Sequence, residues 1–231
     1  MDKIVPTFQW IRLIFLRGRI GQILIASVSF SGCLILARFL YTGSLSFFFL
    51  VWNLFLDCVP YILSRCLAEN EKWLENKFKF GLVFILWLIF IPNSFYILTD
   101  LFHLIHRYPV PFWFDLVLIL SFAWNGLLMG ILSVWQMEKI IQPFLPRIKK
   151  IYFLYPIMVL NAFGVYIGRF LRFNSWDVLT NPFQLAEGIL DIMLHPVEYR
   201  SAWGMTFCFS IFMTLIHLTL KTISKPSGKN I

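Results

Sequence analysis

The chain has 231 residues, of which 59% are hydrophobic, 19% are aromatic and only 14% carry a charge. Soluble domains contain about 45–50% apolar and about 25% charged residues, so this chain has too little polar surface to cover a water-facing exterior. The composition excludes a soluble enzyme, a disordered chain and a disulfide scaffold, and it predicts a protein that sits in lipid. What the formal net charge of +8 indicates depends on where the charged residues lie along the chain.

Six stretches are long and apolar enough to cross a bilayer as helices, since a span needs about 20 mostly apolar residues. They are residues 20–42, 46–67, 80–99, 113–135, 151–171 and 203–221. The first follows a basic leader but is too long for the core of a signal peptide, so we expect a retained span. The sequence thus predicts an all-α, polytopic transmembrane helical bundle that forms one integral membrane domain over residues 1–231.

Lys and Arg residues fall mostly on one side of this predicted membrane topology. The N-terminal segment, the second and fourth loops and the C-terminal tail are rich in them, whereas the opposite side has only Arg107, Arg169, Arg172 and Arg200. Because basic residues mark the cytoplasmic side, we expect both termini in the cytoplasm. The positive charge is then a signal of orientation, and no pattern supports a nucleic-acid partner.

The third span ends in a polar stretch that follows Pro92. On a continuing helix, with about 100° per residue, one face collects four polar residues: Asn93, Tyr96, Asp100 and His103. Ionisable groups at membrane depth are costly and mark functional or packing sites by default. Asp100 and His103 are therefore candidate acid–base residues, and Asn93 and Tyr96 are candidate binding residues.

The fifth span ends in a second polar group, after a GxxxG pattern at 164–168 that favours close approach of another helix. Arg169 and Arg172 share one arc of the helix, and Asn174 and Asp177 follow directly. Guanidinium groups match the oxygens of phosphates and carboxylates, so this group is a candidate anion-binding site. Snorkelling to the lipid headgroups is the simpler alternative for the two arginines.

Further polar residues lie in the first, second and fourth spans. Asp115 and Asn125 of the fourth span are candidate binding residues, while Asp57 lies in the second span and Arg38 in the first. An uncompensated Asp57 in hydrocarbon would protonate or find a partner. Buried asparagines are most simply interhelical hydrogen bonds. As a structural alternative, Asp100, Asp115 and Asp177 would form a salt-bridge network with Arg169 and Arg172 of the fifth span.

The last outer loop, residues 173–202, is too long for a simple connection. Within it, Asn181 is the predicted N-cap and Pro182 the first residue of an amphipathic helix over about 182–194. Its polar face collects Gln184, Glu187, Gly188, Asp191 and His195. Its apolar face collects Leu185, Ile189, Ile192 and Met193. We expect this helix to lie on the outer membrane surface, over the polar residues as a lid.

Three blocks of the sequence carry a resemblance to a known family. They are PNSFYILTDLFHL at 92–104, Phe114 and Asp115 followed by SFAWNG at 121–126, and GRFLRFNSWD at 168–177. The chain resembles, from about residue 45 to 220, a bacterial family of multi-spanning membrane proteins catalogued as domain of unknown function 1361. The resemblance implies a polytopic protein of a bacterial cell membrane, and it supplies no reaction, substrate or cofactor.

Three classes of function remain open for the polar residues, with the lipid bilayer as the one partner common to all. The first is a structural salt-bridge network or scaffold. The second is a membrane enzyme acting on a phospholipid or polyprenyl-linked substrate, with Asp100 and His103 as acid and base. A weaker variant makes this pair metal ligands, completed by His106, Asp115 or His195. The third is a small-anion or proton-coupled transporter. The chain has no GxSxG, P-loop or HExxH motif that would favour the enzyme.

Overall fold

The computed structural model describes residues 19–105, 109–144 and 149–224. In these ranges six helices are long and apolar enough to cross a membrane, which confirms the predicted all-α fold with six spans. They are α2 (Arg19–Thr42), α3 (Phe49–Glu69), α5 with η1 (Lys77–Tyr96 and Ile97–His103), α6 with η2 (Phe112–Ile141 and Gln142–Phe144), α7 with η3 (Lys150–Tyr166 and Ile167–Leu171) and α10 (Arg200–Ile223). Shorter helices join them: α4 (Glu71–Glu75), α8 (Asp177–Thr180) and α9 (Pro182–Leu194).

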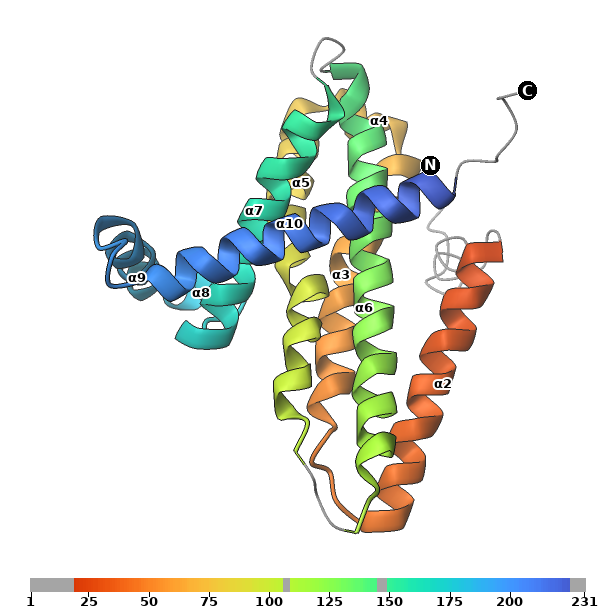
Figure 1. The fold of residues 1–231 in the computed structure, drawn as a ribbon. Coiled ribbons are helices and arrows are strands. Elements are labelled where there is room, and N and C mark those ends of the chain that lie inside the picture. The colour runs from red at the N-terminus through yellow and green to blue at the C-terminus, as the bar shows by residue number, and fades with distance from the viewer. Residues whose placement is uncertain (1–18, 106–108, 145–148, 225–231) are drawn as a thin grey trace, which may run out of the picture. The chain divides into compact units, whose positions relative to one another are not determined.

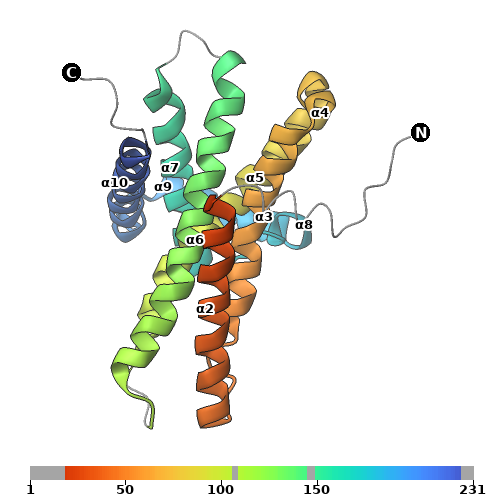
Figure 2. The same ribbon diagram turned by 90° about the vertical axis from the view of Figure 1, so that its right-hand side faces the viewer.

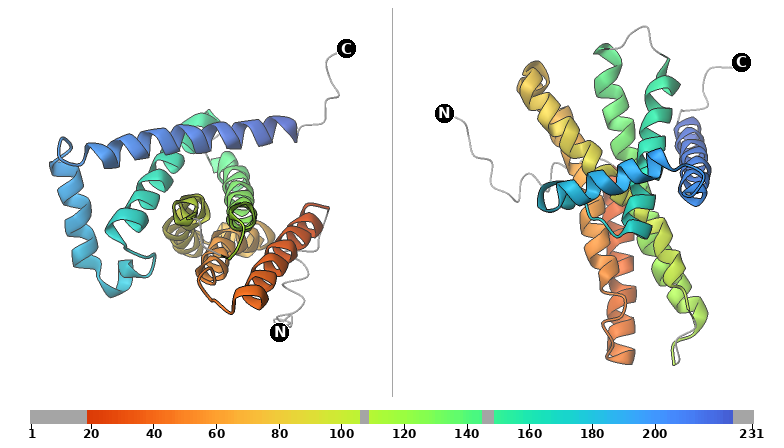
Figure 3. Two further views of the ribbon diagram at one scale, coloured as in Figure 1. Left: turned by 60° about the horizontal axis from the view of Figure 1, so that its bottom comes forward. Right: turned by 90° about the vertical axis from the view of Figure 1, so that its left-hand side faces the viewer.

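The chain divides into two compact units, Met1–Met137 and Glu138–Ile231. The first unit is a bundle in which α2, α3, α5 and most of α6 run side by side (Figures 1 and 3). Its core is built from apolar side chains of α2, α3, η1 and α6, including Leu24, Leu50 and Ile97. The outward side chains are also apolar, which suits helices whose surroundings are lipid tails rather than water.

Two glycines let α6 lie against its neighbours in the first unit. A Cβ atom on Gly126 would stand 2.3 Å from Oδ2 of Asp57 and 2.6 Å from Cγ2 of Ile97. A Cβ atom on Gly130 would stand 2.7 Å from Cβ of Ser94. Both distances are too short for real contacts, so this Gly-xxx-Gly pair of α6 sets the close approach of α6 to α3 and to the third span. The sequence had pointed instead to the pattern at 164–168, which stays a prediction.

The third span changes helix type at its end. α5 contains Pro92 and runs to Tyr96, after which the chain tightens into the 3-10 helix η1. The predicted continuing α-helix is therefore wrong beyond Tyr96. In a 3-10 helix the side chains three residues apart share an edge, so Asp100 and His103 do share one, but their companion is Ile97 and not Tyr96.

The second unit is built on α7 and α10, which pack against each other (Figure 2). The last turn of α7 widens into the π-helical segment η3, and Arg172 ends it in the left-handed region at φ 61°. The chain then forms α8 and α9 before it enters α10. Ile192 of α9 is fully buried against Tyr166 of α7 and Ala202 of α10, which fixes α9 to the rest of this unit.

Candidate functional site

The predicted site residues are divided between the two units. The first unit holds Asn93, Tyr96, Asp100, His103, Asp115 and Asn125. The second unit holds Arg169, Arg172, Asn174 and Asp177.

In the first unit, side chains on one face of α3 lie opposite side chains on one edge of η1 at a regular spacing. Four residues of an α-helix and three residues of a 3-10 helix both rise about 6 Å. Side chains at every fourth residue of α3 therefore stay in register with those at every third residue of η1. We call this arrangement the α3–η1 ladder. Its members are Phe49, Asn53 and Asp57 on α3, and Ile97, Asp100 and His103 on η1. The change to a 3-10 helix is what keeps the two sets of side chains aligned.

Two rungs of the ladder are direct contacts. At the outer rung, the rings of Phe49 and His103 meet edge to face with centroids 5.1 Å apart. At the middle rung, Nδ2 of Asn53 donates a hydrogen bond of 2.7 Å to Oδ2 of Asp100. Asp100 is buried, whereas His103 is partly exposed. The ladder thus leads from the end of the bundle toward its interior.

Asp57 lies at the innermost rung and is fully buried. Its carboxylate and the side chain of Ile97 both lie against Gly126. Within the part of the chain that the structure describes, neither carboxylate oxygen of Asp57 has a hydrogen-bond partner, and the ionisable group that acts on it is another carboxyl group, Asp100. Ser94 donates to the backbone carbonyl of Asp57, at 3.2 Å, and not to the side chain. A charged carboxylate in such surroundings costs several kcal/mol, so Asp57 is placed to hold a proton or a cation.

Asp115, by contrast, is fully paired. Nε of Arg38 donates to Oδ1 of Asp115 at 2.7 Å, and Nη2 donates to Oδ2 at 3.3 Å. Both side chains are buried, and the guanidinium carbon lies 4.3 Å from the centre of the Phe47 ring. The pair joins α2 to α6. The sequence had offered the arginines of the fifth span as partners for Asp115 and had left Arg38 without one.

The amide side chains of the first unit make ordinary structural hydrogen bonds. Nδ2 of Asn125 donates to Oγ of Ser31 and to the carbonyl of Ser121, each at 2.9 Å, so it joins α6 to α2 as an interhelical hydrogen bond. Nδ2 of Asn93 donates to the carbonyl of Phe90 at 2.9 Å. Tyr96 is partly buried at the end of α5. Neither Asn93 nor Tyr96 belongs to the α3–η1 ladder.

In the second unit, Asn174 and Asp177 bind each other. Oδ2 of Asp177 accepts the backbone N–H of Asn174 at 2.6 Å, and Oδ1 accepts the hydroxyl of Thr180 at 2.9 Å. These hydrogen bonds, the backbone one most, lower the pKa of Asp177 below its ordinary value. Asn181 also donates to Asp177, at 3.4 Å. Asn181 occupies the position before α9 as predicted, but its side chain makes no cap hydrogen bond to that helix. The predicted N-cap position of Asn181, with Pro182 as the first helical residue, is therefore confirmed.

The end of α9 has a second acidic centre, Asp191. The hydroxyl of Tyr199 donates to its Oδ2, and Nδ1 of His195 lies 2.9 Å from its Oδ1. The bond from Tyr199 lowers the pKa of Asp191 and raises that of Tyr199, because it favours the charged acceptor and the neutral donor. These contacts tie the end of α9 to the start of α10.

One buried polar group in the second unit was not predicted. Glu138, at the end of α6, is nearly buried, and its oxygens lie 2.5 and 2.7 Å from Nζ of Lys221. Nε2 of the fully buried His217 lies 3.4 Å from the same carboxylate, and Nζ of Lys150 lies 3.9 Å from it. The available signal was a lone glutamate in the fourth span and a histidine and lysine one turn apart in the sixth.

Within residues 19–105, 109–144 and 149–224, no three His, Cys, Asp or Glu side chains are grouped so that they could hold a metal ion. Asp100 and His103, the weak metal candidates, lie on one edge of η1. His106, offered as a further ligand, lies outside the described residues.

Six long apolar helices with polar side chains turned into the bundle define a multi-pass helical membrane protein. The model of one protein family, described as "Protein of unknown function (DUF1361)", matches residues 52–219, and the chain belongs to that family. The matched region includes most of the α3–η1 ladder and the segment from Arg169 to Asp177. Comparisons with curated proteins and with solved structures gave no match.

Proposed function

We propose that the chain moves protons as part of a proton-coupled transport process, with Asp57 as the buried proton acceptor and Asp100 and His103 as the path to it. In this proposal it is a multi-pass protein of a bacterial plasma membrane with both termini in the cytoplasm. The observation that carries it is the fully buried Asp57 carboxylate, which has no hydrogen-bond partner in the described residues. In membrane proteins, chains of Asp, Glu and His mark proton relays.

The order of groups along the ladder supports this role. His103 is partly exposed at the outer rung, Asp100 is buried in the middle and Asp57 is fully buried inside. Histidine is the side chain that exchanges protons most readily near neutral pH, so it suits the position that meets water. Asn53 holds the carboxylate of Asp100 between the two.

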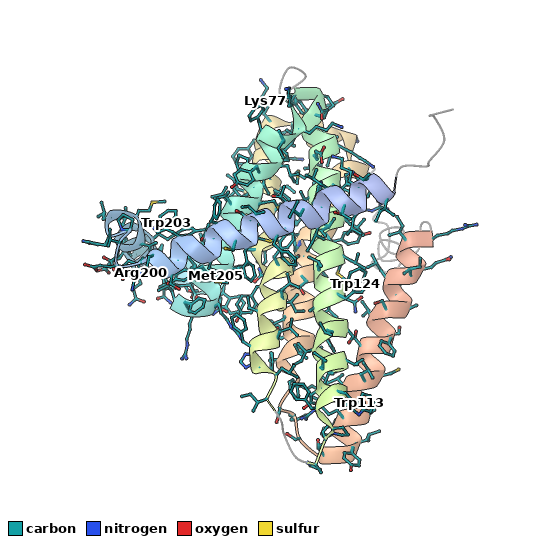
Figure 4. All side chains as sticks on the ribbon, viewed as in Figure 1. Lys77, Trp113, Trp124, Arg200, Trp203 and Met205 are labelled. Carbon is teal, nitrogen blue, oxygen red and sulfur yellow. The ribbon has the colours of Figure 1, made fainter. Side chains whose placement is uncertain are left out.

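The distribution of charge supports the orientation. Lys77 lies at the start of α5 and Trp113 at the start of α6, at opposite ends of the first unit (Figure 4). The end at Lys77 is rich in basic residues, as expected for the cytoplasmic side. The ladder opens at the other end, so protons would enter from outside.

A structural role is favoured for the Arg38–Asp115 pair. Its charges satisfy each other and both are buried, so it joins two helices and has no carboxylate left for chemistry. Of the network predicted from the sequence, which joined Arg169 and Arg172 to the outer aspartates, Asp115 pairs instead with Arg38.

The test uses the full chain reconstituted in liposomes. Dicyclohexylcarbodiimide reacts with protonated carboxyl groups in apolar surroundings, and mass spectrometry locates the product. We expect labelling at Asp57 that decreases as the pH rises, and no labelling at Asp115, whose two carboxylate oxygens are bound by the guanidinium group of Arg38. In the same liposomes, an internal pH indicator should report proton uptake driven by a membrane potential, lost in Asp57→Asn.

The matched control is Leu104→Ala, beside the ladder but without a titratable group, which should keep proton uptake. Asp57 that stays unlabelled at every pH, or proton uptake that is equal in Asp57→Asn and in the unaltered chain, would contradict the proposal.

A further inference from the structure

α9 has three faces, whereas the sequence predicted two. Its packed face consists of Ile192, which is fully buried, and of Leu185, Gly188 and Ile189, which are half-buried. Gly188 lies near Leu171 and Phe173. Its polar face holds Gln184, Glu187, Asp191 and His195. The apolar face predicted to contact the membrane is therefore mostly the face that packs inside the second unit. Met193, which was assigned to it, is 54% exposed and belongs elsewhere.

The third face is apolar and exposed. We call it the α9 stripe and define it as Phe183, Leu190, Met193 and Leu194 of α9, with Leu179 before the helix and Val197 after it. Phe183 is 88% exposed, Leu179 86% and Val197 82%. Residues at spacings of three, four and seven share a helix face, so 183, 190 and 194 form a continuous surface. Full exposure of such side chains to water costs about 1.5–3 kcal/mol each.

We propose that the α9 stripe inserts into the boundary between the headgroups and the acyl chains of the bilayer. Three observations name lipid as its occupant. The segment lies between two membrane-spanning helices, with the end of η3 at Leu171 and the start of α10 at Arg200, so it stays near the membrane surface. Trp203 and Arg200 lie where α10 adjoins α9 (Figure 4), and such residues favour the interfacial zone.

The third observation is charge. From Asp177 to Tyr199 the chain has acidic residues and no Lys or Arg. Attraction to anionic headgroups therefore contributes nothing, and the apolar stripe is what holds the segment in the bilayer. A second copy packed through the same stripe would bring the two acidic faces, with Glu187 and Asp191, alongside each other. Insertion into a zwitterionic bilayer avoids that repulsion.

The test places a fluorescent label on each exposed face. In the full chain with its four cysteines replaced, a single cysteine at Leu190→Cys or Val197→Cys is labelled with an environment-sensitive nitrobenzoxadiazole dye. Glu187→Cys is the matched control on the polar face of the same helix. The proteins are placed in phosphatidylcholine nanodiscs that contain a lipid with a nitroxide quencher high on its acyl chain.

We expect blue-shifted emission and several-fold stronger lipid quenching at 190 and 197 than at 187, unchanged when salt is raised. A label at 197 lies outside α9, so it still reports if Leu190→Cys disturbs the helix. Water-like emission at all three positions would overturn the proposal. So would blue-shifted emission at 190 without lipid quenching but with crosslinking between copies, which would assign the stripe to a second copy of the chain.

Discussion

Two buried carboxylates, one in each unit, have opposite surroundings. Glu138 in the second unit is close to Lys221, His217 and Lys150, so its charge is neutralised by neighbours. Asp57 in the first unit is more deeply buried, and no hydrogen-bond partner for its carboxylate lies within the described residues. A buried carboxylate surrounded by cations pins helices together. A buried carboxylate without such neighbours has no partner to hold its charge, so the two residues should respond differently to substitution.

The largest effect is expected where a paired carboxylate loses its cation. Arg38→Met leaves Asp115 buried and uncompensated, and breaking a buried pair typically costs about 3–5 kcal/mol. We expect a correspondingly large loss of thermal stability of the full chain in detergent micelles. Replacing both partners, Arg38→Met with Asp115→Leu, should recover most of the loss because no charge remains buried. A double variant as unstable as the single one would contradict this account.

A smaller loss of stability is expected when Glu138 is replaced. Glu138→Gln removes the anion beside Lys221, whose side chain is 18% exposed and so retains some access to water. We expect a loss of about 2–3 kcal/mol, at or below the usual range for a broken buried pair. Thermal unfolding with Lys139→Gln as the control on the adjacent residue would measure it. Equal stability of the two variants would show that the contacts of Glu138 contribute nothing.

Gly126→Ala tests how closely α6 approaches Asp57. The new Cβ would clash with Asp57 and with Ile97, and forcing extra atoms into a packed site costs about 1–3 kcal/mol. Gly32→Ala is the matched control, since its Cβ would meet nothing within 4 Å. Combining Asp57→Ala with Gly126→Ala should recover part of the stability that Gly126→Ala loses. If the effects of the two substitutions on stability simply add in this double-mutant cycle, the close approach of α6 to Asp57 is contradicted.

The sequence was a good guide to what depends on local composition. All six spans were predicted because a helix in lipid must satisfy its own backbone and therefore needs a long apolar stretch. The predicted helix over 182–194 agrees with α9 for the same kind of reason. Arg38, Asp57 and Asp115 were recognised as costly groups at membrane depth, since that follows from their chemistry alone.

Pairings between distant residues could not be predicted. Whether Asp115 meets Arg38 or another arginine depends on how the helices are rotated, and a single sequence does not give that rotation. The ladder was missed because it requires η1 to be a 3-10 helix, and Ile97–His103 has no composition that distinguishes this from a last α-helical turn. The faces of α9 were misassigned for a related reason, since only tertiary packing decides which apolar face is covered.

Asp57→Asn tests the carboxylate that, unlike Glu138, has no hydrogen-bond partner among the described residues. Because an asparagine resembles a protonated aspartate in shape and charge, we expect stability to change by less than about 1 kcal/mol, as is usual when a substitution neither opens a cavity nor buries a new charge. Thermal unfolding should show this, while the carbodiimide product disappears. A loss as large as that of Glu138→Gln would mean that Asp57 is an ionised residue with a structural partner.

The smallest effect is expected at Asp177, a carboxylate outside the spans that accepts hydrogen bonds from Asn174, Thr180 and Asn181. Its pKa is lowered from the ordinary value of 3.8, mainly by the backbone N–H of Asn174. Because the folded pKa is the lower one, its stabilising contribution is present above that ordinary value and is lost as the pH falls through the folded pKa.

We therefore expect Asp177→Asn to weaken protection of the Asn174 amide from hydrogen exchange at about pH 6, and we expect the difference between the two proteins to shrink as the pH falls through the lowered pKa of the native Asp177. Comparing the two proteins at each pH removes the chemical pH dependence of exchange itself. Asn174 takes its protection from Oδ2 of Asp177 at 2.6 Å, so the effect should be confined to the start of α8. A difference that stays equal down to the lowest pH at which the protein remains folded would mean that geometry, and not the charge of Asp177, holds this turn. Asp177 would then resemble neither Glu138, whose carboxylate contacts cations, nor Asp57, whose buried carboxylate has no hydrogen-bond partner among the described residues.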